Sequence, residues 1–161
     1  NVTTQDIEMM EEDVAKKVLV AREVLFDKDK NLFVSGEGKQ ISYAANVWAI
    51  LAHIWDEDKN REILNALAKE SDAEMMVTPY MHHHYVAALL SCGEKEKAYN
   101  HMISYWGDMV EKGADTFYEL YNPENPFESP YGSSIVNSYC HAWSCTPTYL
   151  MRMCGLTKEN I

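Results

Sequence analysis

The chain has 161 residues, of which 47% are hydrophobic and 24% are charged, a composition typical of one soluble globular unit with an apolar core. The formal net charge is −11, from 25 acidic and 14 basic residues. A negative field of this size repels nucleic acid and anionic membranes, so both are excluded as main partners. No stretch reaches the ~20 consecutive apolar residues that a membrane helix needs.

The first half of the chain predicts an alternation of charged and nearly uncharged helices. Residues 3–26 place apolar side chains at helical spacing behind a threonine cap and an acidic first turn. Residues 27–40 contain two glycines and predict a connecting turn. Residues 42–55 form a helix that is apolar nearly all round, and we therefore expect it to be buried on most sides. Residues 57–70 return to a charged, surface type of helix.

The second half continues this alternation. Residues 78–93 begin with a threonine cap and a proline at the first helical position, and they end at a glycine suited to a left-handed terminator. Residues 94–111 predict an amphipathic helix that is closed by a lysine and a glycine. A last helix is expected from Ser138 to Gly155, with a kink or restart at Pro147.

Alternating outer and inner helices are the pattern of stacked αα-hairpins, in which one layer lines an interior and the other faces water. The sequence therefore predicts an all-α fold of three hairpins. Three hairpins arranged in this way form an arc, so we expect residues 1–161 to be part of a larger α/α toroid. The four cysteines show no metal-binding spacing and are interpreted as buried free thiols.

One carboxylate stands out in the stretch GADTFYELYN, residues 113–122, where Glu119 is surrounded in sequence by Phe117, Tyr118 and Tyr121. The stretch predicts an extended segment rather than a helix. Aromatic rings that exclude water would raise the pKa of the carboxyl group, and this would suit a general base. The alternative is an ordinary solvated loop acid.

A second candidate is the stretch SYCHAWSCTP, in which His141 and Trp143 are placed to face a central cavity. Indole rings stack on sugar faces and histidine donates to hydroxyl groups. The alternative for His141 is a core histidine bonded to a backbone carbonyl. Asn46 and Trp106, on predicted helices, are further candidates for substrate contacts, with interior packing as their alternative.

The three consecutive histidines at 82–84 do not predict a metal site. Neighbouring residues of a helix point about 100° apart, so three adjacent imidazoles cannot converge on one ion. Neither a phosphate-binding glycine loop nor a cofactor fingerprint is found in the sequence. The sequence therefore predicts no metal and no cofactor.

Several of these stretches, in this order, resemble the bacterial α-L-rhamnosidases, family 78 of the glycoside hydrolases. They are Thr-Pro-Tyr at 78–80, Trp-Gly at 106–107, the glycine-to-glutamate run at 113–119 and Cys-His-Ala-Trp-Ser-x-x-Pro at 140–147. Tyr118 departs from the tryptophan of many family members, and this puts the identity of the sugar in doubt.

The resemblance implies that this chain is the C-terminal half of an (α/α)6 barrel of twelve helices. It implies inverting hydrolysis of terminal α-L-rhamnosyl linkages, with Glu119 as the general base. His141, Trp143, Trp106 and Tyr118 would contact the sugar. No stretch resembles the acidic loop that supplies the family's general acid, so the chain alone is expected to be inactive. Its exposed inner-helix surface could then lead to self-association.

Two other classes of function remain open at this point. One is a non-catalytic helical module that binds a carbohydrate or a protein partner. The other is a different α/α-toroid glycosidase, or a polysaccharide lyase with a tyrosine or histidine base. The sequence leaves open the aglycone and the compartment, whether bacterial cytoplasm, periplasm or secreted.

Overall fold

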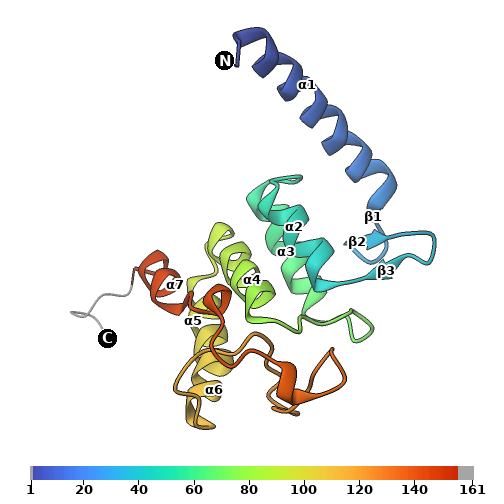
Figure 1. The fold of residues 1–161 in the computed structure, drawn as a ribbon. Coiled ribbons are helices and arrows are strands. Elements are labelled where there is room, and N and C mark those ends of the chain that lie inside the picture. Colours follow the sequence, from blue (N-terminus) through green and yellow to red (C-terminus); the bar gives the residue numbers. More distant parts are fainter. Residues whose placement is uncertain (1, 156–161) are drawn as a thin grey trace. The chain divides into compact units, whose positions relative to one another are not determined.

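The computed structural model describes residues 2–155 and shows a mostly helical protein with one small sheet (Figure 1). The chain divides into two compact units, the first ending at Glu74 and the second beginning at Met75. No helix within the described residues combines the length and the apolar character required to cross a bilayer.

The first unit opens with helix α1, Thr4–Val20, which continues as a π-helical turn over Ala21–Leu25. Thr3 caps it as predicted, because its hydroxyl accepts a hydrogen bond from the backbone N–H of Asp6 at 3.2 Å. None of the residues in α1 is buried. Its apolar residues therefore remain exposed; Met10, for example, is 63% exposed.

A three-stranded antiparallel sheet follows, in the order β1-β2-β3, where the sequence predicted only a turn. The all-α prediction is therefore wrong in this region. The physical reason is the run Leu32, Phe33 and Val34, whose side chains are all buried in the first unit. The strands are β1 Phe26–Asp27, β2 Leu32–Ser35 and β3 Gln40–Ile41.

Helices α2, Tyr43–Leu51, and α3, Glu57–Leu67, complete the core of the first unit. Each begins at a side-chain cap, Ser42 for α2 and Asp56 for α3. Helix α2 contacts both β2 and α3, as the nearly uncharged sequence predicted for a helix covered on most sides.

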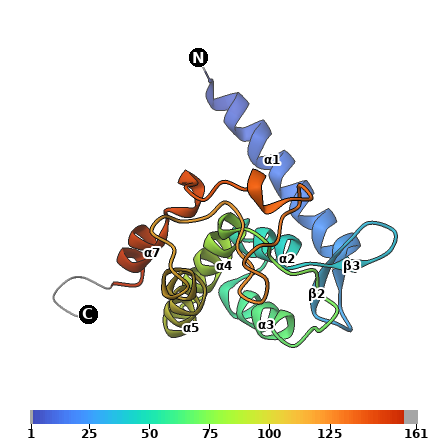
Figure 2. The same ribbon diagram turned by 60° about the horizontal axis from the view of Figure 1, so that its bottom comes forward.

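The second unit is built around α4, Pro79–Ser91, whose cap at Thr78 and terminator at Gly93, with a φ of 74°, are both as predicted. The next helical stretch runs as α5, Lys95–Met102, then a π-helical turn over Ile103–Gly107 and α6, Asp108–Glu111. Helix α4 contacts α5 and also α7 (Figure 2).

Helix α7 spans Pro147–Met153, so the predicted start of the last helix near Ser138 is wrong. Between α6 and α7 the chain forms no α-helix and only two short 3-10 turns, Ser134–Val136 and Ala142–Ser144. Three segments make up this connection, and we call residues 115–121 the glutamate segment, 122–136 the proline loop and 137–145 the histidine segment.

The cysteines in the structure are free thiols, in agreement with the sequence. Their predicted burial holds only in part, because Cys92 is buried and Cys154 is half-buried, whereas Cys140 and Cys145 are exposed. The two exposed thiols both lie in the histidine segment, whose expected helix is missing. Other residues of the segment, such as Ser144, are buried, so the segment is packed into the core only in part.

Candidate active site

The glutamate and histidine segments lie side by side in the second unit, although the proline loop separates them in sequence. The backbone N–H of Glu119 donates to the carbonyl oxygen of Ser138 at 2.8 Å. The N–H of His141 donates in turn to the carbonyl oxygen of Phe117, also at 2.8 Å. The main chain therefore holds the two motifs together that the sequence singled out separately.

Hydrogen bonds from side chains also hold the glutamate and histidine segments together. The hydroxyl of Ser144 donates to the carbonyl oxygen of Tyr118 at 2.6 Å. The carbonyl oxygen of Ser144 accepts a hydrogen bond of 3.0 Å from the indole N–H of Trp106. Trp106 is only 2% exposed, so its ring is not accessible for the predicted contact with the sugar. Its indole instead supports the histidine segment through this hydrogen bond. The bond to Ser144 places Trp106 beside the histidine segment, with its ring buried.

The carboxylate of Glu119 receives one donor on each oxygen. The phenol hydroxyl of Tyr131 donates to Oε1 at 2.8 Å, and the backbone N–H of Ser138 donates to Oε2 at 3.2 Å. These hydrogen bonds, with a smaller effect from the imidazole of His141, lower the pKa of Glu119 below its ordinary value. The side chain is half-buried and accessible to water.

The prediction of a raised pKa for Glu119 is therefore wrong. It assumed that the neighbouring rings of the segment enclose the carboxylate. Instead, Leu120 and Tyr121 are both buried, so the expected alternation of sides breaks down at the end of the segment. The hydroxyl of Tyr121 donates to Asp108, and its ring packs edge-on against Tyr105 with centroids 5.6 Å apart. The pKa of Glu119 is therefore determined mainly by hydrogen bonds and less by loss of solvation.

An exposed aromatic surface, formed by Tyr80, His141 and Trp143 and called here the aromatic platform, lies next to the glutamate. The rings of His141 and Trp143 stack with centroids 4.1 Å apart and an angle of 28°. Tyr80 at the start of α4 brings its ring centroid to 5.8 Å from that of Trp143. Tyr80 and Trp143 are each 41% exposed, whereas His141 is half-buried. The indole Nε1 of Trp143 donates to the carbonyl oxygen of Glu119 at 3.4 Å.

Tyr118 lies beside this surface but is half-buried. Its ring packs edge-on against Tyr139 with centroids 4.9 Å apart. Its backbone N–H lies 3.5 Å from the sulfur of Met109. Its carbonyl oxygen accepts a hydrogen bond from the hydroxyl of Ser144, so Tyr118 is held against the histidine segment. Its contact with the sugar stays a prediction.

Asn46 lies in the first unit and is fully buried. Its amide oxygen accepts the N–H of Phe33 at 2.8 Å, and its amide nitrogen donates to the carbonyl oxygens of Phe33 at 3.1 Å and Ser42 at 3.0 Å. The predicted role in substrate binding is corrected, because every polar atom of this side chain is used to hold β2 on α2. The alternative of interior packing with satisfied hydrogen bonds is the one observed.

The three histidines of α4 point to three different sets of neighbours, as their helical spacing requires. His82 is buried, its Nδ1 lies 2.8 Å from Nε2 of His101, and its ring stacks on that of Tyr105. His83 faces Tyr149, and His84 packs against Tyr80 in the platform. Burial lowers the pKa of His82 to about 3 and that of His101 to about 4.

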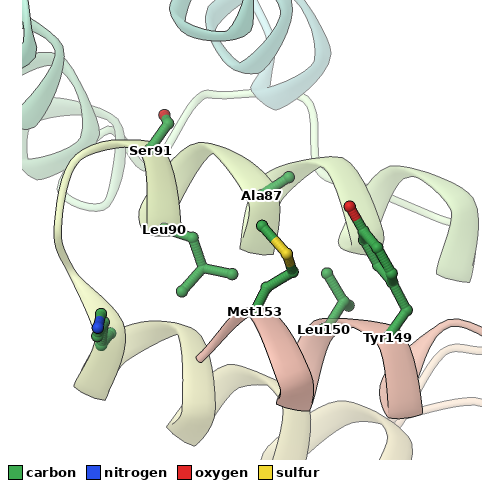
Figure 3. A pocket seen from close by; sticks show the side chains of 7 residues that line it. Ala87, Leu90, Ser91, Tyr149, Leu150 and Met153 are labelled. Atoms are coloured by element: carbon green, nitrogen blue, oxygen red, sulfur yellow. The ribbon is translucent and has the colours of Figure 1, made fainter. Parts of the chain in front are cut away.

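A small cavity of about 230 Å³ opens between α4 and α7 (Figure 3). Its walls are almost entirely apolar and contain none of the predicted site residues. A single lysine, Lys95, brings a charge to the edge of the cavity. We interpret this cavity as a packing gap between helices rather than as part of the site. Its lining residues are Ala87, Leu90, Ser91, Lys95, Tyr149, Leu150 and Met153.

Two functional candidates were missed by the sequence reasoning. Tyr131 comes from the proline loop, which separates the two predicted motifs in the sequence. Ser138 contributes a backbone N–H, a group that every residue except proline possesses. No local pattern marks either of them, and only the folded loop reveals that both reach Glu119.

Comparison with solved structures shows which proteins this chain is similar to. A rhamnosidase from Klebsiella oxytoca with rhamnose bound matches 86% of this chain at 46% identity, with a TM-score of 0.83. The chain resembles part of a rhamnosidase. The resemblance stated from the sequence motifs is therefore confirmed. The chain spans 27% of that rhamnosidase.

A second rhamnosidase, of the GH78 family and from Bacillus sp. GL1, matches 84% of the chain at 23% identity with a TM-score of 0.69. At this identity the match speaks only for a shared fold. The chain spans 15% of that rhamnosidase. Neither a protein-family model nor a curated protein matches this chain.

Proposed function

We propose that this chain is part of the catalytic domain of an α-L-rhamnosidase of glycoside hydrolase family 78, and that Glu119 is its general base. The observation that carries the proposal is the position of Glu119 beside the stacked rings of His141 and Trp143. The 46% identity to a rhamnosidase supports the proposal, as does the exposed aromatic ring of Trp143, which is suited to a sugar.

The proposed reaction is an inverting hydrolysis. Glu119 accepts a proton from a water molecule, and the resulting nucleophile attacks the anomeric carbon from the face opposite to the leaving group. A general acid outside this chain donates a proton to the leaving oxygen. The two carboxyl groups of such a pair lie about 6.5–9.5 Å apart, which leaves room for the water.

The hydrogen bonds to Glu119 keep the carboxylate ionised, which a base requires, although the lowered pKa also makes it a weaker proton acceptor than the raised pKa expected from the sequence would. A carboxylate with a lowered pKa is already ionised in neutral and mildly acidic solution. Each carboxylate oxygen has two lone-pair positions, so the bonds from Tyr131 and Ser138 leave one on each oxygen. A water molecule can therefore still donate to Glu119.

The sugar would be bound by the aromatic platform together with Tyr118. Exposed rings of Trp143 and Tyr80 offer apolar faces to the C–H groups of a sugar. The imidazole of His141 provides a hydrogen-bonding group at the same place. In this proposal the ligand is a terminal rhamnosyl group, and neither a metal nor a cofactor takes part.

The rest of the proposed domain would complete the fold. We interpret residues 1–161 as the C-terminal half of an (α/α)6 toroid, with the general acid in the other half. The exposed apolar residues of α1 fit this interpretation, since a helix without buried residues needs a neighbour. The chain alone is then expected to lack activity and to associate with itself through such surfaces.

A second candidate is a carbohydrate-binding module without catalytic activity. The stacked pair of His141 and Trp143, in which the ring of Trp143 is exposed, favours it, because an exposed aromatic ring can bind a sugar whether or not a base is present. The two candidates differ in what happens to the bound sugar. A module binds rhamnose and leaves the glycosidic bond intact.

The test is a screen of nitrophenyl glycosides with the natural full-length polypeptide that contains this chain, and with the chain alone. We expect the full-length protein to cleave the α-L-rhamnoside and not the glucoside or galactoside. We expect the chain alone to cleave none. Binding of rhamnose without cleavage by the full-length protein would favour the module, and no response to rhamnosides at all would refute both candidates.

A further inference from the structure

We propose that Tyr131 is a positioning residue for Glu119, and that the proline loop exists in part to bring its hydroxyl to the carboxylate. The inference rests on the proposed function, because it assigns a second residue to the same site. Its starting point is the hydrogen bond of 2.8 Å from the phenol hydroxyl of Tyr131 to Oε1 of Glu119.

The two donors on Glu119 restrict the orientation of its carboxylate. Ser138 donates to Oε2 from the backbone at 3.2 Å, while Tyr131 donates to Oε1 from a side chain. Rotation about the terminal torsion of Glu119, which is otherwise broad, would break both bonds. Removal of either donor would leave the carboxylate free to turn about the remaining bond. A base that removes a proton from water depends on this orientation.

The proline loop is fastened so that it can hold Tyr131 in place. The amide of Asn122 donates to Oε2 of Glu128 at 2.5 Å, and the amide of Asn137 donates to the backbone carbonyl of Glu128 at 2.7 Å. Glu128 is thus bonded to residues at both ends of the loop. Next to Glu128 in the chain, Ser129 accepts a separate hydrogen bond of 3.2 Å at its hydroxyl from the N–H of Tyr131.

The ring of Tyr131 gains little from burial. The residue is 58% exposed, so packing of its ring contributes little to its position. Loss of the hydroxyl alone should therefore leave the fold almost unchanged, because exposed hydrogen bonds contribute little to stability. A change in the properties of Glu119 after loss of this hydroxyl would then show a positioning role of Tyr131, because the loop itself stays folded.

Three groups facing Glu119 determine its charge state. They are the hydroxyl of Tyr131, the backbone N–H of Ser138 and the imidazole of His141. The bond from Tyr131 is the largest cause of the lowered pKa of Glu119. Its removal should raise that pKa towards the ordinary value, while His141 and Ser138 remain in place.

The test is Tyr131→Phe, measured in two ways. In the full-length polypeptide we expect the acidic limb of kcat/KM to move to higher pH, because that limb reports the base of the free enzyme. We expect kcat on the plateau to fall roughly tenfold with KM little changed, because the carboxylate loses its fixed orientation. In the 161-residue chain, an NMR titration of the Glu119 side chain should show the same direction of shift.

Tyr139→Phe is the matched control. Its hydroxyl also serves the proline loop, through a hydrogen bond of 2.9 Å to the carbonyl oxygen of Ser134, but it does not reach Glu119. This variant should leave the acidic limb where it is. An equal shift of the acidic limb in both variants would show that any loosening of the proline loop changes the pKa of Glu119. This result would overturn the assignment of Tyr131 as a positioning residue.

The failure of this inference and the failure of the proposed function are distinguishable. If Tyr131→Phe leaves both the acidic limb and the NMR titration of Glu119 unchanged, Tyr131 has no positioning role, whatever Glu119 does. If Glu119→Gln leaves hydrolysis intact, Glu119 is not the base and the proposed function fails. In that case the NMR titration of Glu119, with and without the hydroxyl of Tyr131, still tests whether the two residues interact.

Discussion

The indole nitrogen of Trp143 lies 3.4 Å from the backbone carbonyl oxygen of Glu119, although the two residues are 24 positions apart. This contact joins the two motifs that the sequence marked independently, one by a carboxylate among aromatic residues and one by a histidine next to a tryptophan. Because the contact uses the backbone of Glu119, it leaves the carboxylate oxygens to other partners.

Replacement of Trp143 by alanine should weaken sugar binding. The ring of Trp143 contacts both other rings of the aromatic platform, those of His141 and Tyr80. We expect KM for a rhamnoside to rise roughly tenfold or more in the full-length polypeptide, since loss of a central aromatic contact costs more than about 1 kcal/mol. Steady-state kinetics measure this.

Trp143→Phe is the control for this prediction, because it keeps a ring but loses the indole N–H that bonds Glu119. KM should recover much of the way towards its original value in this variant. An unchanged KM in Trp143→Ala would show that the platform does not bind the substrate.

The stability of the chain should decrease as the pH falls below neutrality. His82 and His101 have pKa values of about 3 and about 4 because burial disfavours their charged forms. In the unfolded chain both would titrate near 6.5, so the unfolded state takes up protons first. Stability is therefore fully present above about pH 6.5 and is lost as the pH falls towards the folded values.

Urea unfolding of the 161-residue chain at pH 7 and pH 5 measures this loss. We expect the free energy of unfolding to drop by on the order of 2–4 kcal/mol between the two. His101→Gln removes one member of the pair and should reduce the pH dependence. Equal stability at both pH values would mean that these imidazoles are not buried in their neutral forms.

Asn46→Ala should destabilise the protein without affecting sugar binding. The amide bonds the N–H and the carbonyl of Phe33, so the substitution leaves two buried backbone groups without their partner. We expect a loss of about 2–4 kcal/mol, measured by urea unfolding. Asn100→Ala, at an exposed position of α5, should change stability by less than about 0.5 kcal/mol. A rise in KM for the Asn46 variant, at unchanged stability, would restore its predicted role in binding.

The helix ends were predictable because their signals are local. Thr78, Pro79, Gly93 and Gly113 each act within one turn of chain, and each is found where the sequence placed it. The short sheet was missed for the opposite reason. Strands of two to four residues carry too little pattern of their own, and their pairing depends on α2 behind them.

The histidine segment was predicted as a helix because its aromatic residues look like an inner-helix face. In the structure its backbone bonds the glutamate segment instead, as in the bond from His141 to Phe117. Sequence reasoning singled out Glu119, Tyr118, His141 and Trp143, and the fold brings their two segments together. The roles of these residues stay predictions. Sequence reasoning could not find Tyr131 or the lowered pKa, because both depend on the path of the proline loop.

The most direct test of the account is kcat of the Glu119→Gln variant in the full-length polypeptide, with Glu124→Gln as its control. Glu124 is an exposed acid of the neighbouring proline loop, so its substitution makes the same change in charge away from the site. We predict that kcat for the rhamnoside falls by about 10³-fold for Glu119→Gln, with KM changed little, and that it is retained for Glu124→Gln. A kcat equal to that of the unmodified protein in the Glu119 variant would contradict the account.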